Sequence, residues 1–145
     1  MIDVNALQQY SLFGGVSPEQ IEQIRPLLGS AHFDAGECPQ HEGEPNDKIY
    51  FIISGEVDIV KKGVVIAHLR EGETFGEMEL LDIMPSIATV RATTPLEVVT
   101  ISNRALYEIS KRDLKTFSML IMNLARDLSR RLRRMDELMC EDDGK

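Results

Sequence analysis

The sequence is poor in cysteine. Its only two cysteines, Cys38 and Cys140, lie far apart in the 145-residue chain and form no disulfide framework, so we expect reduced thiols in a cytoplasmic protein. Long apolar runs are lacking as well, and the segment IYFII at residues 49–53 is far too short to span a bilayer. The first ten residues show no basic start followed by an apolar run, so we expect neither a signal peptide nor a membrane partner.

Positive charge is also scarce. The chain has 16 Lys and Arg residues against 24 Asp and Glu residues, which gives a net charge of −8. Affinity for nucleic acid comes mainly from Lys and Arg side chains that neutralise phosphates, so we expect no nucleic-acid partner for this acidic chain. The length and the hydrophobic content of 43% instead fit one soluble domain, residues 1–145, with a real core.

Residues 1–30 have the pattern of short helices. Asp3 is placed to cap the first of them. The second carries the start signals of a capping box with an N-terminal proline, in Ser17, Pro18 and Gln20. Pro26 is expected to shorten or kink this second helix, because proline lacks the N–H that a helix interior requires.

Residues 31–102 have a different pattern, typical of short antiparallel strands. Runs rich in β-branched and aromatic residues alternate with turn residues such as Gly, Asn and Asp, and this spacing favours a sandwich or a barrel. The one helical insertion is the segment GEMELLD at residues 76–82. The expected strands are the runs AHF, KIYFIIS, EVDIVK, VVIAHL, IATVRATT and LEVVTIS.

Residues 103–140 are expected to be helical again. Asn103 can cap a first helix, and an amphipathic pattern then runs from about Leu114 to Met139. At ~100° per residue, one stripe of this long helix is apolar and consists of Phe117, Ile121, Leu124, Leu128, Leu132, Met135 and Met139. Four arginines fall on the opposite side: Arg126, Arg130, Arg133 and Arg134.

Two segments of the sequence, taken together with the order of the helical and strand regions, form a specific pattern. The first, EGEPNDKIYFIISGEVDIV at residues 42–60, has Gly43 and Gly55 at turns, and the second is FGEMELL followed by PSIATV between residues 75 and 90. With them, nearly the whole chain resembles the cyclic nucleotide-binding domain family, the cupped β-roll of catabolite-activator-type regulators and cyclic-nucleotide-dependent kinase subunits. The resemblance implies a mainly β fold with flanking helices (α+β), a jelly roll or double-stranded β-helix, with short N-terminal helices and a long C-terminal helix.

The resemblance also implies a function without catalysis, because this family binds a cyclic nucleotide and moves its C-terminal helix in response. The segments FGEMELL and PSIATV are similar to the phosphate-binding cassette of the family. Gly76 would let the backbone approach an anion, and Glu77 matches a glutamate that accepts a hydrogen bond from the ribose 2′-hydroxyl. Both also fit plainer roles, a turn glycine and an acid favoured at a helix N-terminus. The ligand-contact residues that the resemblance implies are Phe75, Gly76, Glu77, Met78, Ser86, Ile87 and Ala88.

The cassette departs from the family pattern at the position of its cation. Ser86 stands where the family has an arginine that makes a bidentate contact to the cyclic phosphate, and no Lys or Arg lies between residues 75 and 90. Glu79 stands where a small residue is usual, and it either repels a phosphate or points to the surface. Ile87 is bulkier than usual and has no donor. Losing one hydrogen bond to a charged group, ~1.5–3 kcal/mol, weakens binding ~10–100-fold or more.

Another arginine is not expected to replace this cation. Side chains alternate along a strand, so Arg91 lies on the opposite face from Ser86. Arg126 or Arg130 reaches the cassette only if their face of the long helix turns inward, whereas a solvated face is the expectation. The resemblance therefore implies cyclic AMP, cyclic GMP or another small anion as the ligand, with ordinary cyclic nucleotides bound weakly.

The apolar stripe of the long helix is expected to form a dimer seam. The helix reaches roughly 35 Å, more than one small β-roll covers, and an uncovered apolar stripe calls for a partner. Packing of the whole stripe on its own domain is the alternative. The arginines opposite suit an acidic protein partner rather than DNA, since no helix-turn-helix is expected after this helix. The residues expected in a homodimer seam are Phe117, Ile121, Leu124, Leu128, Leu132 and Met135.

No catalytic or metal site is expected. His32, His41 and His68 have no Ser, Cys or carboxylate partner at a telling spacing, and a zinc site at Cys38 and His41 lacks a second pair of ligands. Three hypotheses about the function of the chain remain open. The chain is a regulatory module that senses a ligand, or a ligand-free degenerate domain for dimerisation or protein interaction, or an enzyme on a β-roll scaffold, for which a catalytic constellation is lacking.

Overall fold

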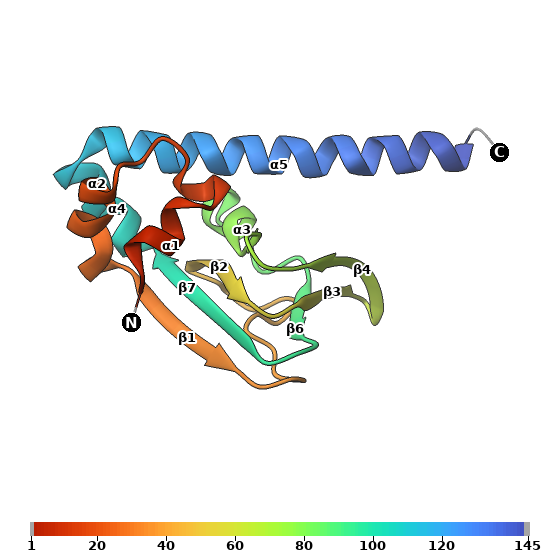
Figure 1. Ribbon diagram of the computed structural model, residues 1–145. Helices are drawn as coiled ribbons and strands as arrows, with labels where there is room; N and C mark the ends of the chain where they lie inside the picture. The colour runs from red at the N-terminus through yellow and green to blue at the C-terminus, as the bar shows by residue number, and fades with distance from the viewer. Residues whose placement is uncertain (1, 144–145) are drawn as a thin grey trace.

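The computed structural model describes residues 2–143 and has two antiparallel sheets flanked by helices (Figure 1). The helices before the sheets are α1 (Val4–Gln8), η1 (Ser11–Phe13), α2 (Pro18–Ile24) and η2 (Arg25–Leu27). The strands are β1 (Gly29–Phe33), β2 (Lys48–Ser54), β3 (Val57–Lys61), β4 (Val64–Leu69), β5 (Thr74–Phe75), β6 (Thr89–Ala92) and β7 (Leu96–Ser102). The remaining helices are α3 (Glu77–Asp82), between β5 and β6, and α4 (Asn103–Arg112) and α5 (Leu114–Asp143), after β7. The expected fold class, mainly β with flanking helices, is confirmed.

The two sheets enclose one of the two hydrophobic cores of the protein. Their strand orders are β1-β7-β2-β5 and β4-β3-β6, and all pairs are antiparallel. Because successive side chains of a strand point to opposite faces, β2 serves both cores. Tyr50 and Ile52 point into the inner core between the sheets, whereas Ile49 and Phe51 point into the outer core beneath the helices. Burial on both faces explains why KIYFIIS is a continuous apolar run.

The strand runs of the sequence lie where they were expected. KIYFIIS, VVIAHL and LEVVTIS coincide with β2, β4 and β7, and residues 76–82 hold the expected helical insertion. Two differences concern the edges of the four-stranded sheet. The strand β1 begins at Gly29, two residues before residue 31, and the two-residue β5 was not expected. The strand β5 exists because Phe75 and Thr74 pair with β2, a contact between segments far apart in the sequence.

The helix starts follow the expected capping chemistry except at α4. Asp3 accepts hydrogen bonds from the first-turn N–H groups of α1, and Ser17 forms the capping box of α2. The helix α2 ends at Ile24, before the 3₁₀ turn that contains Pro26, as expected. The prediction that Asn103 caps α4 is wrong: the cap is Ser102, the last residue of β7.

The long helix α5 is divided between two environments, which corrects the prediction of one continuous dimer seam. In its first half, Phe117, Ile121 and Leu124 pack on the outer core, because η1 and α4 lie against this part of the helix. Leu124 is only 5% exposed. In its second half, Leu132 and Met135 are both 60% exposed, and the helix continues past α3 (Figure 1). Leu128, at the junction, is half-buried.

The helices of the structure can be compared with the expectation that no segment spans a membrane. No helix within residues 2–143 combines the length and the apolar content that crossing a bilayer requires.

Candidate functional site

The cassette is built from β5, the short helix α3 and the loop that leads to β6. Gly76 caps α3 with a left-handed backbone, at φ 87°. A Cβ atom at this position would lie 2.4 Å from the carbonyl oxygen of Lys48 on β2 and 2.8 Å from Nδ2 of Asn46. Close packing on β2 therefore requires glycine here, whether or not a ligand binds.

The structure divides the expected ligand-contact residues into three groups. Phe75 lies in the inner core, where its ring stacks on Tyr50 with centroids 4.7 Å apart. Met78 and Ile87 are at the surface, 44% and 41% exposed. Glu77, Ser86 and Ala88 are buried, and these three with Gly76 remain as candidates for ligand contact.

The loop after α3 follows the expected alternation of side chains. Ser86 and Ala88 are buried, whereas Ile87 and Arg91 are exposed. Arg91 lies across the sheet from Asp58, with their nearest charged atoms 3.9 Å apart, and so points away from the cassette interior. The expectation that Arg91 does not replace the missing cation is confirmed.

A segment before β2 holds this loop in place. The N–H of Gly43 donates to the carbonyl oxygen of Ser86 at 2.8 Å. The N–H of Ser86 donates to the carbonyl oxygen of Glu44 at 2.9 Å. The N–H of Val90 donates to the carbonyl oxygen of Gln40 at 2.9 Å. These backbone bonds fix the face that Ser86 presents inward.

Glu79 points inward, and the alternative that it faces the surface is wrong. Glu79 is 5% exposed, and its Oε1 accepts a hydrogen bond from Nε2 of Gln40 at 2.5 Å. The same nitrogen of Gln40 lies 3.4 Å from the carbonyl oxygen of Ala88, which ties the pair to the cassette loop. Sequence reasoning did not find Gln40, since nothing local distinguishes it from its loop neighbours.

An arginine does reach the cassette, although not one of those considered from the sequence. Arg131 of α5 donates from Nη1 to Oε1 of Glu77 at 3.0 Å, and from Nη2 to the carbonyl oxygen of Thr74 at 2.6 Å. The spacing Leu124, Leu128, Arg131, Met135 places it on the apolar side of the helix, and this signal could have identified it. The four arginines named from the sequence are all exposed: Arg126, Arg130, Arg133 and Arg134.

The electrostatics of Glu77 are set by burial and by Arg131. Its side chain is 4% exposed, and that of Arg131 is 21% exposed. Burial raises the pKa of the Glu77 carboxyl group above its ordinary value, while the Arg131 guanidinium and a backbone N–H oppose the rise and nearby Glu79 adds to it. The Arg131 guanidinium is therefore engaged with Glu77 and Thr74, so the cassette interior gains no free cation from it.

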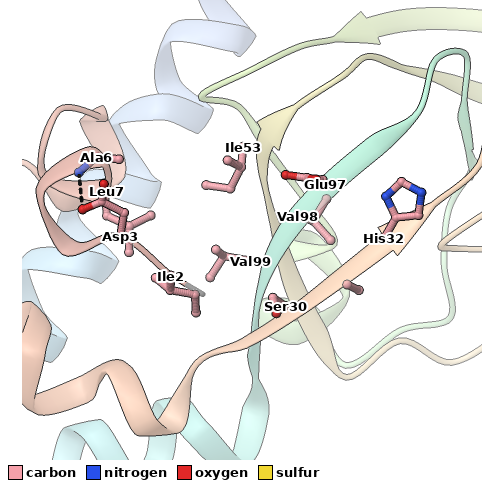
Figure 2. A pocket seen from close by; sticks show the side chains of 11 residues that line it. Ile2, Asp3, Ala6, Leu7, Ser30, His32, Ile53, Glu97, Val98 and Val99 are labelled. Carbon is pink, nitrogen blue, oxygen red and sulfur yellow. Dashed lines mark hydrogen bonds between the residues drawn. The ribbon is translucent and has the colours of Figure 1, made fainter.

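Several cavities lie outside the cassette. One, of about 460 Å³, lies between α1 and the outer face of the four-stranded sheet, with Ile2, Ile53 and Val99 around it (Figure 2). Two of its polar groups already have roles within the protein, since Asp3 caps α1 and His32 is hydrogen-bonded to Asp34. Another, a groove of about 650 Å³, is lined by Ser11, Gly72, Glu73, Asp127, Arg130, Arg131, Arg133 and Arg134. Arg130 and Arg134 pair there with Asp127 and Glu73.

Two of the three histidines, His32 and His68, have carboxylate neighbours that were not predicted from the sequence. His68 Nδ1 lies 2.5 Å from Asp58 Oδ1 across β3 and β4, and His32 Nε2 lies 3.3 Å from Asp34 Oδ1. The pairing of β3 with β4 creates the first pair, so spacing along the sequence gave no sign of it. Within the part of the chain that the structure describes, no three His, Cys, Asp or Glu side chains gather as a metal site requires.

Comparison with protein families gives a match over more than half of the chain. The family model described as cyclic nucleotide-binding domain matches residues 30–113. The match begins in β1 and ends directly after α4, so it includes both sheets and the cassette.

Individual relatives are regulatory proteins. The chain is 36% identical over 96 residues to the cAMP-dependent protein kinase regulatory subunit of Eremothecium gossypii, covering 66% of this chain and 21% of that protein. It is 28% identical over 147 residues to the CRP-like cAMP-activated global transcriptional regulator of Mycobacterium tuberculosis, covering 93% of this chain and 61% of the regulator. The chain thus spans about a fifth of the kinase subunit.

A solved structure shows the same fold over almost the whole chain. The crystal structure of a cyclic nucleotide-binding domain from Methylobacillus flagellatus superimposes with a TM-score of 0.85 at 26% identity. The superposition covers 95% of this chain and 81% of that one, so it includes the N-terminal helices and most of α5.

Proposed function

Because the chain belongs to the cyclic nucleotide-binding domain family, we propose that it is a non-catalytic regulatory module in which a ligand at the cassette changes the position of α5. The observation that carries this proposal is the contact between Arg131 in the middle of α5 and Glu77, the first residue of α3. In the family, the residue at the position of Glu77 meets the ribose of the ligand. A ligand hydroxyl that donates to the Glu77 carboxylate draws on the same negative charge as Arg131, which weakens the ion pair and so loosens α5 from the cassette.

Ordinary cyclic AMP and cyclic GMP are poor ligands in this proposal. Ser86 supplies one neutral hydroxyl in place of the family's arginine, and Glu79 adds a second buried carboxylate to the cassette, beside that of Glu77. A cyclic phosphate therefore meets negative charge and loses a bidentate contact, which costs ~1.5–3 kcal/mol for each charged hydrogen bond. We expect dissociation constants weaker than ~1 μM, the value that corresponds to about −8 kcal/mol.

Calorimetry with cyclic AMP and cyclic GMP tests this proposal. The variant Ser86→Arg, combined with Glu79→Ala, should bind at least one of the two nucleotides ~10–100-fold more tightly than the wild type does. A matched control is Ile87→Arg, which adds the same charge one residue later on the exposed face and should gain nothing. Wild-type dissociation constants of ~1 μM or tighter would contradict the proposal that the missing charge matters.

A second candidate function is a ligand-free interaction module. Four exposed apolar side chains surround the cassette, and they favour a protein contact: Met78, Ile83, Met84 and Ile87. Ile83 is 88% exposed and has a left-handed backbone at φ 57°, which is costly for a β-branched residue. If the double variant gains no affinity for either nucleotide, the pocket has degenerated beyond two residues, and this second function is favoured.

The exposed second half of α5 supports a homodimer within either function. Leu132, Met135, Leu138 and Met139 are 60–64% exposed along one side of the helix. Arg134 and Asp136 lie on opposite flanks of this stripe, at nearly the same height. A parallel pair of α5 helices would therefore place Arg134 of one copy near Asp136 of the other, whereas an antiparallel pair would bring like charges together.

A further inference from the structure

Three buried polar atoms around the cassette have no hydrogen-bond partner among the described protein groups. They are Oε1 of Gln40, Oε2 of Glu77 and Oγ of Ser86. The three residues are 7%, 3% and 3% exposed. An unpaired buried polar atom typically costs ~1–3 kcal/mol, and native proteins contain few of them. Three such atoms in the residues around the cassette are consistent with a site that binds a polar ligand.

The chemistry of these atoms is that of acceptors. A carboxylate oxygen of Glu77 and the amide oxygen of Gln40 can only accept hydrogen bonds, and the hydroxyl of Ser86 can accept or donate. Glu79 adds a second buried carboxylate, of which only Oε1 is bonded to Gln40. Helix α3 thus holds two buried carboxylates, and among the ion pairs of the described residues only Glu77 of the two has a cationic partner, Arg131. A ligand that carries negative charge is therefore disfavoured here, and a hydrogen-bond donor is favoured.

Ser86 and Glu79 replace an arginine and a small residue of the family, and this replacement matches the loss of the cyclic phosphate from the ligand. In a cyclic nucleotide, the phosphate joins the 3′ and 5′ oxygens of ribose, and only the 2′-hydroxyl remains as a sugar donor. Without the phosphate, both oxygens become hydroxyls, and the molecule is uncharged. A site for the phosphate needs a cation, such as the arginine of the family. A site for two hydroxyls needs acceptors, and Glu79 and Ser86 are acceptors at these cassette positions.

We propose that the cassette binds a nucleoside with free 3′ and 5′ hydroxyls in place of a cyclic nucleotide. Glu77 accepts from the 2′-hydroxyl, and Glu79 and Ser86 accept from the 3′ and 5′ hydroxyls, with Gln40 orienting Glu79. This assignment rests on the proposed function, namely that the cassette is the ligand site. A metal ion fits less well, because no three acidic, His or Cys side chains of residues 2–143 gather to hold one.

The test is calorimetry on the full chain with adenosine, guanosine, cytidine and uridine, each next to its 3′,5′-cyclic monophosphate. At least one nucleoside should bind ten-fold or more tightly than its cyclic counterpart. The 3′-deoxy and 5′-deoxy forms of that nucleoside should each bind about ten-fold more weakly, since each removes one hydroxyl that the carboxylates and serine accept. These analogues leave the protein unchanged, so loss of folding cannot produce the result.

Variants then separate the two proposals. Ser86→Arg with Glu79→Ala should reverse the preference toward the cyclic nucleotide, whereas Glu97→Ala, on the outer face of β7, should leave it unchanged. A wild type that prefers the cyclic form overturns the nucleoside assignment. If no nucleoside binds the wild type but the double variant binds a cyclic nucleotide, the nucleoside assignment fails and the cassette as ligand site stands. If neither protein binds any of these compounds, both proposals fail.

Discussion

At the scale of single residues, Glu77 has the most unusual environment in the cassette. It is the first residue of α3, its carboxyl group is almost fully buried, and the Arg131 guanidinium lies 3.0 Å away. Burial is the largest influence and raises the pKa of this carboxyl group, so the folded protein holds the Glu77 proton more tightly than the unfolded chain does.

This environment predicts a pH-dependent stability that Glu77→Gln should remove. The raised pKa means that the contribution of Glu77 is fully present below its ordinary pKa of about 4.3 and is lost as pH rises through the folded-state value. Glutamine resembles the protonated form at every pH. Urea denaturation between pH 4 and pH 7 should therefore show the free energy of unfolding of the variant rising relative to the wild type as pH increases.

The matched control is Glu56→Gln, an exposed carboxylate before β3. Its difference from the wild type should stay nearly constant over the same pH range. A constant difference for Glu77→Gln as well would show that the buried carboxyl group has an ordinary affinity for its proton.

Gly55, in the turn between β2 and β3, is a second residue with a measurable consequence. Its φ is 99°, and an added Cβ would lie 2.3 Å from the carbonyl oxygen of Pro95. Gly36 has a similar φ of 93° but open space around the added atom. Gly36→Ala should cost about 1 kcal/mol from backbone strain alone, and Gly55→Ala about 2–4 kcal/mol because the clash adds to it. Thermal and urea denaturation measure both, and equal costs would exclude the clash.

At the scale of secondary-structure elements, the start of α4 shows how a strand supplies the cap of the next helix. Ser102 ends β7, and its Oγ accepts a hydrogen bond from the N–H of Ala105 at 3.0 Å. Ser102→Ala should lower the free energy of unfolding by about 1 kcal/mol, and Asn103→Ala should leave it nearly unchanged. The reverse order in urea denaturation would restore the assignment of the cap to Asn103.

The elements that the sequence predicted well are those with a strong local pattern. The run KIYFIIS is buried on both faces and rich in β-branched residues, and the capping box at Ser17 is a local motif. The strand β5 and the pair of His68 with Asp58 depend on contacts between separate segments of the chain, so no local sequence pattern predicted them.

The candidate site was predictable in part for the same reason. The alternation that buries Ser86 and Ala88 is a property of extended backbone, and it was read correctly from the sequence. The inward direction of Glu79 depends on how a six-residue helix packs on its neighbours, and helix periodicity over so few residues does not determine it. The reach of Arg131 to Glu77 depends on where α5 crosses the cassette.

At the scale of the whole molecule, the two halves of α5 should respond differently to truncation of their leucines. Leu124 is 5% exposed in the outer core, whereas Leu132 is 60% exposed. Leu124→Ala should cost about 2–5 kcal/mol of unfolding free energy. Leu132→Ala with Met135→Ala should leave the stability of the monomer nearly unchanged and dissociate the homodimer.

Sedimentation and urea denaturation together check this division. At tens of micromolar protein, the wild type should sediment as the proposed dimer, and the Leu132 and Met135 double variant should sediment as a monomer. A wild type that is already monomeric at that concentration would contradict the homodimer and leave the second half of α5 for another protein.

The position of Arg131 along α5 also has a mechanical consequence. The helix continues from this contact to Asp143, a stretch of roughly 18 Å at about 1.5 Å per residue. If a ligand loosens this contact, as proposed, the first half of α5, which packs on the outer core, would be the pivot, and the stretch beyond Arg131 would be a lever arm. A tilt of about 10° about Leu124 would move Arg131, roughly 10 Å along the helix, by about 2 Å and Asp143, roughly 28 Å along it, by about 5 Å. Loss of the ion pair between Arg131 and Glu77 would then produce its largest displacement at the far end of α5, away from the cassette.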